Sequence, residues 1–255
     1  MRVKLPNGLL DGQDHFNYIV ISELTGKQQN YLADRELLES NIGHIPKIIS
    51  DMIVSLETKE GLQWKGNLKE LVWKLPAGDL ETIIIKIREN TFGSRYYFEA
   101  VCEHCGHINK NQRLDLDKLK VESITLKQMM DPNRRTIKLP KSGKTVLVKP
   151  LYLQDMFDSL KIAKDNQDKL ITSIIALNIA NIDGKEDITT QDIEDLPMMD
   201  IYHLQDKLED MKLEGFIDTD IEMDCNSCKK EFKTELNLWS PDFFFHTRGS
   251  KNTRS

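Results

Sequence analysis

The four cysteines of the chain form two C-x-x-C pairs, Cys102 with Cys105 and Cys225 with Cys228. A C-x-x-C turn places two sulfur atoms on one side of a tight loop, where they can occupy two corners of a tetrahedral zinc site. Two pairs therefore predict one structural Zn2+ per chain, bound by all four thiolates. Because four thiolates leave no coordination position open for water, the predicted metal stabilises structure and does not catalyse a reaction.

Other interpretations of the cysteines stay open. They could form redox dithiols or be ordinary buried cysteines, and His104 or His107 beside the first pair could replace one ligand. Strand-like segments flank both pairs, and the βαβ context of a thioredoxin-like motif is missing, which favours the metal. The separation of the pairs leaves open whether both bind the same ion.

An internal repeat would explain this separation. Zinc ribbons separate their pairs by roughly 15–20 residues, whereas Cys102 and Cys225 are 123 positions apart. Four landmarks recur in the same order, at offsets of 134, 126, 121 and 123: Leu5 and Leu139, Ile48-Ile49 and Ile174-Ile175, Leu75-Pro76 and Leu196-Pro197, and the two cysteine pairs. Two related halves packed about a pseudo-twofold axis would bring both pairs to one metal. The fold prediction depends on this repeat, because overlooking a repeat leads to a wrong fold.

The predicted fold class is α+β, with two related α+β halves that each end in a C-x-x-C β-hairpin knuckle and are joined by a zinc-ribbon-like site of four cysteines. The N-terminal half is predicted at 1–120 and the C-terminal half at 138–246, with a linker at 121–137 and a disordered tail at 247–255. Hydrophobic periodicity and turn residues predict the elements within the halves. These are a turn at Leu5–Gly8, strands at 18–21, 96–101, 111–116, 145–149, 217–223 and 231–238, and helices at 45–56, 80–89, 171–182 and from 196 onward.

No set of residues indicates catalysis. Asp79 and Asp200 each follow a Leu-Pro pair, but a carboxylate in the first turn of a helix is stabilised by the helix dipole, so a structural role is preferred to acid–base chemistry. Gly143-Lys144-Thr145 lacks the first glycine of a phosphate-binding loop and precedes a strand. The six histidines are scattered, and no serine has the context of a nucleophile. The chain is therefore predicted not to be an enzyme.

Length and charge indicate a mildly acidic protein of ordinary composition. The chain has 255 residues, of which 39% are hydrophobic, enough for a sizeable core. Its net charge of −6 disfavours non-specific nucleic-acid binding, which needs clustered lysine and arginine. No stretch reaches the roughly 18–20 apolar residues of a membrane span, and no small-molecule site is indicated. The N-terminus lacks the apolar segment of a signal peptide, which predicts the cytoplasm.

Aromatic residues gather near the C-terminus, at Trp239, Phe243, Phe244 and Phe245. They could pack on the protein's own helices, which is the interpretation we slightly prefer. They could also anchor a protein partner, because aromatic side chains concentrate at the centres of interfaces. The two uses are compatible.

Several segments occur in a characteristic order, namely Glu23-Leu24-Thr25-Gly26-Lys27, Leu75-Pro76-Ala77-Gly78-Asp79, Ile87-Arg88-Glu89-Asn90-Thr91-Phe92-Gly93, the two C-x-x-C pairs and Ser240-Pro241-Asp242-Phe243-Phe244. In this order they resemble the T4-type bacteriophage baseplate hub assembly family, over roughly residues 5 to 245. The resemblance implies an assembly factor (a morphogenesis chaperone) or a minor structural component of the tail baseplate hub. Its implied partners are hub and tail proteins, met in the host cytoplasm during assembly or in the baseplate of the virion. Only the four cysteines can be matched residue by residue, as metal ligands.

A zinc-ribbon regulator that binds nucleic acid is the alternative function. Lys229, Lys230 and Lys233 form a small basic cluster around the second cysteine pair. Such a cluster is more often a solvated face of a hairpin, and binding to phosphates would weaken steeply with salt. A protein-binding role is therefore preferred.

Overall fold

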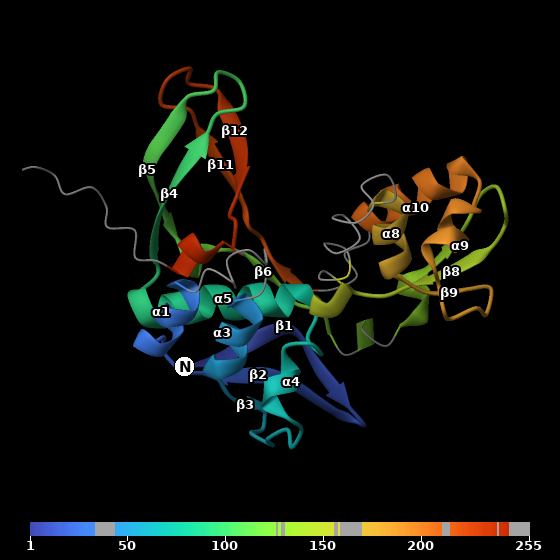
Figure 1. The fold of residues 1–255 in the computed structure, drawn as a ribbon, viewed down its shortest axis with the longest axis horizontal. Coiled ribbons are helices and arrows are strands. Elements are labelled where there is room, and N and C mark those ends of the chain that lie inside the picture. Colours follow the sequence, from blue (N-terminus) through green and yellow to red (C-terminus); the bar gives the residue numbers. More distant parts are fainter. Residues whose placement is uncertain are drawn as a thin grey trace, which may run out of the picture.

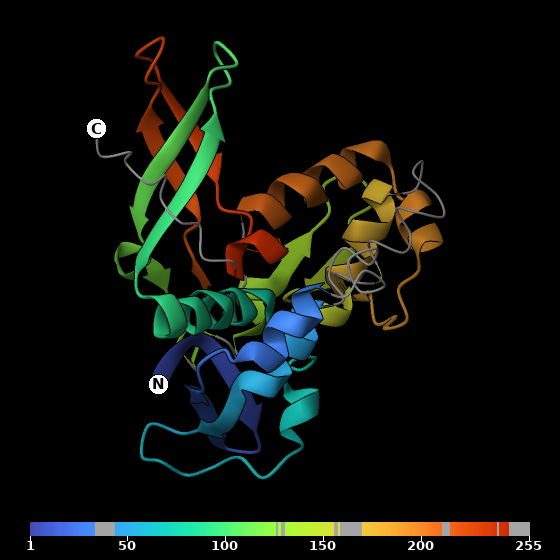
Figure 2. The same ribbon diagram turned by 60° about the vertical axis from the view of Figure 1, so that its left-hand side comes forward.

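The structure, a computed structural model, describes residues 1–33, 44–125, 127–128, 131–155, 158, 170–210, 215–238 and 240–244. It contains two antiparallel three-stranded sheets with helices packed on them, and two long β-hairpins that stand side by side (Figure 1, Figure 2). Helices and strands are both abundant, so the fold is α+β as predicted. None of the helices in these ranges combines the length and apolarity that crossing a membrane requires.

The first sheet has the strand order β1-β2-β3 and is antiparallel throughout. Its elements and the accompanying helices are β1 (Arg2–Asp11), β2 (Asp14–Ile21), β3 (Ile53–Glu57), α1 (Gly26–Ala33), α3 (His44–Met52), α4 (Leu68–Leu71) and α5 (Ala77–Phe92). Helix α5 runs between this sheet and the hairpins (Figure 1). Because α5 is covered on more than one side, its isoleucines at 83–85 and 87 are all fully buried.

The second sheet repeats the strand order and the direction of the first. Its strands are β7 (Thr136–Lys138), β8 (Thr145–Val148) and β9 (Ile179–Ile182), and its helices are α8 (Leu170–Leu177), α9 (Thr190–Glu194) and α10 (Met198–Asp210). Apolar residues between Ile137 and Leu204 form a core of their own. The described residues therefore build two main hydrophobic cores, one at each sheet.

The two hairpins project together from the body of the protein (Figure 1, Figure 2). They consist of β4 (Arg95–Val101) with β5 (Ile108–Asp115), and of β11 (Asp220–Asp224) with β12 (Glu231–Glu235). The short strands β6 (Val121–Glu122) and β10 (Phe216–Ile217) pair with each other. The described residues also form the 3-10 helices η1 (Leu116–Lys118), η2 (Pro132–Arg135) and η4 (Pro241–Phe244). The β6–β10 pair ties the segment after the first hairpin to the segment before the second.

Two predicted helices end earlier than predicted, at corresponding points of the two sheets. The segment 45–56 is helical only to Met52, and β3 begins at Ile53. The segment 171–182 is helical only to Leu177, and β9 begins at Ile179. Short apolar runs do not distinguish a buried helix from a buried strand by periodicity alone. In both places the β-branched residues favour the strand, which completes a three-stranded sheet.

The turn predicted at Leu5–Gly8 lies inside β1 instead of before the first strand. The register between β1 and β2 shifts between Lys4 and Leu9, and Gly8 has a φ of +79°. A Cβ atom on Gly8 would come within 2.5 Å of the carbonyl oxygen of Phe16. The proline and glycine therefore mark a bulge that bends one continuous strand.

The chain from residue 215 onward leaves the second core and completes the first. Its buried apolar residues, which pack with those of β1, β3 and α5, are Ile217, Leu236, Leu238, Phe243 and Phe244. The predicted C-terminal half at 138–246 thus supplies residues to both cores. The predicted linker at 121–137 contains β6, η2 and the start of β7.

Two glycines and one asparagine form the junction where this segment arrives. A Cβ atom on Gly78, in the first turn of α5, would lie 2.2 Å from the carbonyl oxygen of Gly215. The Asn7 side chain donates to that same carbonyl oxygen at 2.8 Å and accepts from the Gly215 amide at 2.6 Å. Only residues without a side chain allow the two backbones to approach this closely.

Candidate metal centre

The tips of the two hairpins carry the cysteines in matching turns. In each turn, the amide four positions after the first cysteine donates to the carbonyl oxygen of that cysteine, at 2.8 Å in the first hairpin and 3.0 Å in the second. The amide of the first cysteine donates to the carbonyl oxygen five positions later, at 2.9 Å in both. Gly106 and Lys229, which occupy corresponding positions, have φ values of +70° and +61°. The same turn therefore forms twice, and on the second occasion a lysine adopts the left-handed conformation.

The four sulfur atoms come together although half the chain separates the pairs. The Sγ atoms of Cys102 and Cys228 are 3.7 Å apart, and those of Cys105 and Cys225 are also 3.7 Å apart. All four lie within 4.8 Å of one another, and they are the one such group of three or more metal-ligating side chains among the described residues. Four sulfur ligands at about 2.3 Å from a tetrahedral Zn2+ would be about 3.8 Å apart. The spacing and the chemistry of this donor set fit a metal ion, and the cluster could hold one.

A small apolar core supports the cluster from below. Cys102 and Cys225 are buried, whereas Cys105 is exposed and Cys228 is half-buried. The two buried cysteines pack with Ala100 and Phe232, apart from the two main cores. A cluster this small supplies little hydrophobic stabilisation, and structures of that size commonly depend on a metal or on disulfides.

Asn109, which the sequence analysis did not single out, connects the hairpins beneath the sulfur atoms. It lies on the first hairpin, is fully buried, and accepts a hydrogen bond from the amide of Asn226 on the second hairpin at 2.8 Å. Its Nδ2 atom lies 3.3 Å from the carbonyl oxygen of Ala100 and 3.8 Å from Cys225 Sγ. Groups that hydrogen-bond to a ligand orient it and tune the metal. An isolated asparagine near a C-x-x-C pair carries no sequence signal for this role.

The pKa values of two of the cysteines are shifted in opposite directions. Burial raises the pKa of Cys225, but the amides of Cys228 and Ser227 stabilise its thiolate and lower the pKa to about 6. The amide of His107 lowers the pKa of Cys105, yet desolvation and the neighbouring sulfur atoms raise it to about 12. Thiolates this close repel one another, and a divalent cation would offset the repulsion.

Neither histidine beside the first pair belongs to the sulfur cluster. His104 Nε2 donates to the carbonyl oxygen of Glu231 at 2.9 Å, so its ring bridges the hairpins. His107 contributes its backbone to the turn. The geometry therefore favours the four cysteines over a set that contains a histidine.

The two aspartates that follow the Leu-Pro pairs each bind two consecutive backbone amides of an earlier segment, at a bend of the chain. We call these two contacts the aspartate tethers. Asp79 accepts from the consecutive amides of Asn7-Gly8 at 2.8 and 2.7 Å. Asp200 accepts from the consecutive amides of Lys141-Ser142 at 2.7 and 2.9 Å. Both side chains are buried. Each carboxylate therefore fixes its helix to its sheet through distant backbone amides, which local sequence cannot identify.

The two carboxylates differ in acidity. Burial raises the pKa of Asp79 to about 7, against the opposing effect of its hydrogen bonds with Asn7 and Gly8. Burial also acts on Asp200, but hydrogen bonds from Ser142 and Lys141 outweigh it and leave the pKa below its usual value. At pH 7, therefore, Asp79 is close to half protonated, whereas Asp200 is ionised.

The aromatic residues near the C-terminus divide into two groups. Phe243 and Phe244 are 1% and 2% exposed and belong to the first core. The ring of Phe243 lies 5.1 Å from that of Tyr96, and its carbonyl oxygen accepts from Arg88 Nε at 2.9 Å. This is the packing interpretation, and a partner could contact these two rings only after they leave the core. Trp239 and Phe245 lie outside the described residues.

The α+β fold and the cysteine cluster define a protein in which two distant hairpins meet at a potential metal centre. A family model described as "T4 bacteriophage base plate protein" matches residues 19–246. The chain therefore belongs to this family, and the resemblance seen in the sequence is confirmed. Membership associates the chain with the baseplate of a phage tail. No curated protein and no solved structure matches it.

Proposed function

We propose that the chain is an assembly factor or a minor component of the baseplate hub, which acts by binding other tail proteins and catalyses no reaction. Family membership over residues 19–246 is the observation that carries this proposal. In the host cytoplasm the protein would bind hub subunits during tail assembly, either leaving again as a chaperone or staying in the virion. Its described surface, including the projecting hairpins, would provide the contacts (Figure 1).

We further propose that Zn2+ bound by Cys102, Cys105, Cys225 and Cys228 fastens the two hairpins, one ion per chain. The sulfur spacing supports this, because each 3.7 Å pair takes one atom from each hairpin. The two sheets with the same strand order, the matching turns and the matching aspartate tethers support the proposal that the chain consists of two related halves. In that arrangement the metal joins equivalent points of the two halves.

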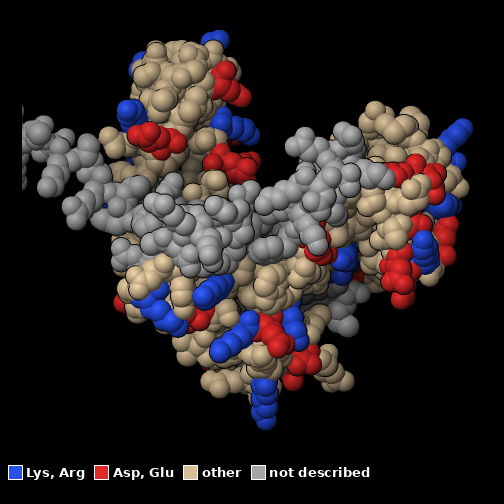
Figure 3. All heavy atoms as spheres, viewed as in Figure 1, with Lys and Arg blue, Asp and Glu red and all other residues tan. Residues whose placement is uncertain are grey.

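The charge distribution favours protein partners over nucleic acid. Lys233, in the basic cluster around the second cysteine pair, is paired with Glu222 across the hairpin at 2.9 Å. On the face drawn in Figure 3, basic and acidic side chains are interspersed over the described part of the surface. Binding to phosphates requires clustered positive charge, which an alternating surface does not provide.

Affinity purification of a tagged chain from infected cells tests the proposal. We expect hub or baseplate proteins to co-purify and to be identified by mass spectrometry. A variant with both Cys225→Ser and Cys228→Ser, purified in parallel, separates the role of the metal from that of the remaining surface. Recovery of no tail protein by a wild-type chain that is folded and monodisperse would overturn the proposal. An inventory of purified virions then distinguishes a retained component from a transient factor.

A further inference from the structure

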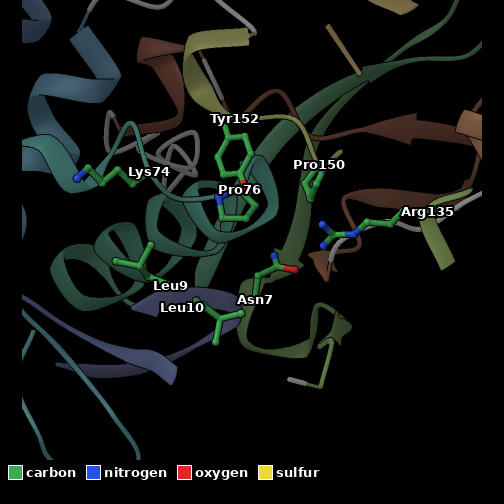
Figure 4. A pocket seen from close by; sticks show the side chains of 9 residues that line it. Asn7, Leu9, Leu10, Lys74, Pro76, Arg135, Pro150 and Tyr152 are labelled. Atoms are coloured by element: carbon green, nitrogen blue, oxygen red, sulfur yellow. The ribbon is translucent and has the colours of Figure 1, made fainter. Parts of the chain in front are cut away.

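A small cavity lies where the first sheet meets the segment between η2 and the second set of helices. Its volume is about 180 Å3, and residues 7–10 of β1, Pro76 and Tyr152 form much of its wall (Figure 4). Pro76 and Tyr152 form an antiparallel bridge, and the amide of the adjacent Ala77 donates to the carbonyl oxygen of Leu151 at 3.0 Å. Backbone hydrogen bonds therefore fix the shape of this cavity.

Arg135, the last residue of η2, directs its guanidinium group into the cavity toward Asn7 (Figure 4). The side chain is half-buried and has no hydrogen-bond, ion-pair or ring partner within the described part of the chain. The Asn7 amide group is not paired with it, and its atoms bond with Asp79 and Gly215 instead. Lys74 lies at the rim, and its ammonium group points away from Arg135 in the same view. A single, partly desolvated cation therefore faces this space without an anion.

The size and the walls of the cavity restrict what it can bind. Sites for drug-sized ligands measure about 300–1,000 Å3, so a cavity of about 180 Å3 fits one residue-sized group. Leu9, Leu10 and Pro150 line it together with polar groups, and no described acidic residue lines it. One planar guanidinium matches one carboxylate through two parallel hydrogen bonds. A phosphate dianion would leave part of its charge unmatched by a single guanidinium group.

We propose that this cavity binds the carboxylate of a glutamate or aspartate in a partner protein, presented on an extended segment with apolar residues on both sides. The identity of the partner as a tail protein rests on the proposed function, whereas the site and its ligand class rest on the cavity alone. The occupant would contact the first sheet and the segment that leads to the second sheet at once. Binding would therefore hold these two parts of the protein in one relative position.

Titration of 15N-labelled full-length protein with the peptide acetyl-Leu-Glu-Leu-amide tests the inference. We expect saturable shifts at the Arg135 Nε–Hε resonance and at the amides of residues 8–10. Acetyl-Leu-Gln-Leu-amide, which has the same shape without the charge, should bind at least tenfold more weakly. Inorganic phosphate forms a third arm of the experiment.

The variant Arg135→Gln should abolish saturation by the glutamate peptide, while Lys138→Gln, an exposed change on the neighbouring strand, should leave it intact. Backbone spectra of both variants show whether the fold is retained. Equal binding of both peptides, unchanged binding to Arg135→Gln, or binding of phosphate alone would each overturn the inference. A positive co-purification from infected cells together with no peptide binding would reject this site and leave the proposed function standing.

Discussion

The Sγ atom of Cys102 lies 3.7 Å from that of Cys228, although the two residues belong to different hairpins. The second close contact, between Cys105 and Cys225, also crosses from one hairpin to the other. A metal at the centre would therefore link one hairpin to the other. Binding of a structural metal is coupled to folding. Because both hairpins run into the first core, we expect metal binding to stabilise that core as well.

Metal analysis of the purified, reduced protein should give one zinc ion per chain. Cys102→Ser should lower this ratio and lower the unfolding temperature, because three thiolates and a hydroxyl bind Zn2+ more weakly than four thiolates. A chelator should destabilise the wild-type protein in the same direction. Ser227→Ala, a change in the second turn that spares the cysteines, serves as the control. Two ions per chain, or none, would contradict the shared site.

Replacement of Asn109 should weaken metal binding without removing a ligand. Asn109→Leu removes the contact with Cys225 and the acceptor for the Asn226 amide, while it roughly keeps the side-chain volume. Changes of groups that support a ligand typically cost about 10–100-fold in metal affinity. Competition with a chromogenic zinc chelator measures the change. Asn237→Leu, at an exposed position, should leave the affinity unchanged; equal affinities of the two variants would show that Asn109 is not a support of the metal site.

The sequence predicted the chemistry of the centre better than the path of the chain. Two C-x-x-C pairs specify tight turns locally, and a repeat of four landmarks in the same order, with offsets that vary by loop-sized amounts, explained how they could meet. The helix-to-strand changes at Ile53 and Ile179 were missed, because the apolar spacing there is compatible with a helix, and only pairing with the neighbouring strands favours the sheet. The role of Asn7 at Gly215 was also missed, because no local pattern marks a contact between residues 208 positions apart.

The burial of Phe243 makes the C-terminal segment important for stability. Phe243→Ala should lower the free energy of unfolding by about 3–5 kcal/mol, the usual cost of removing a buried phenylalanine ring. It would also expose Arg88, whose NH1 atom is buried without a hydrogen-bond partner in the described structure. Tyr202→Ala, at a position with 56% exposure, is the control and should cost much less. Urea unfolding followed by circular dichroism measures both, and similar midpoints would contradict the packing interpretation.

Two glycines near helix starts should respond differently to alanine. Gly78→Ala places a Cβ atom 2.2 Å from the carbonyl oxygen of Gly215, and relief of such a clash typically costs about 1–3 kcal/mol. Gly26→Ala, at the start of α1, meets no atom within 4 Å. Alanine there should be neutral or should stabilise by up to about 1 kcal/mol, because it is the better helix former. Thermal unfolding of both variants checks the difference, and a stabilised Gly78→Ala protein would show that the segment from residue 215 does not pack on α5.

The two aspartate tethers should give opposite dependences of stability on pH. The pKa of Asp79 is about 7 in the folded protein, above the ordinary aspartate value of 3.8, so the folded state holds the extra proton between these values. Its contribution is fully present below pH 4 and is lost as the pH rises through 7, by an amount on the order of 4 kcal/mol at most. Asp79→Asn should remove this loss and flatten the profile between pH 4 and 8.

The pKa of Asp200 is lowered, so its contribution is present above the unfolded value and is lost as the pH falls through the folded one. Asp200→Asn should therefore destabilise the protein at pH 7 and have less effect near pH 3. Urea midpoints of the wild type and both variants, measured from pH 3 to 8, separate the two tethers. If the urea midpoints of Asp79→Asn change with pH in the same way as those of the wild type, the prediction is wrong. The hydrogen bonds from Asn7 and Gly8 then fully offset the burial of Asp79, and the carboxylate stays ionised across this range.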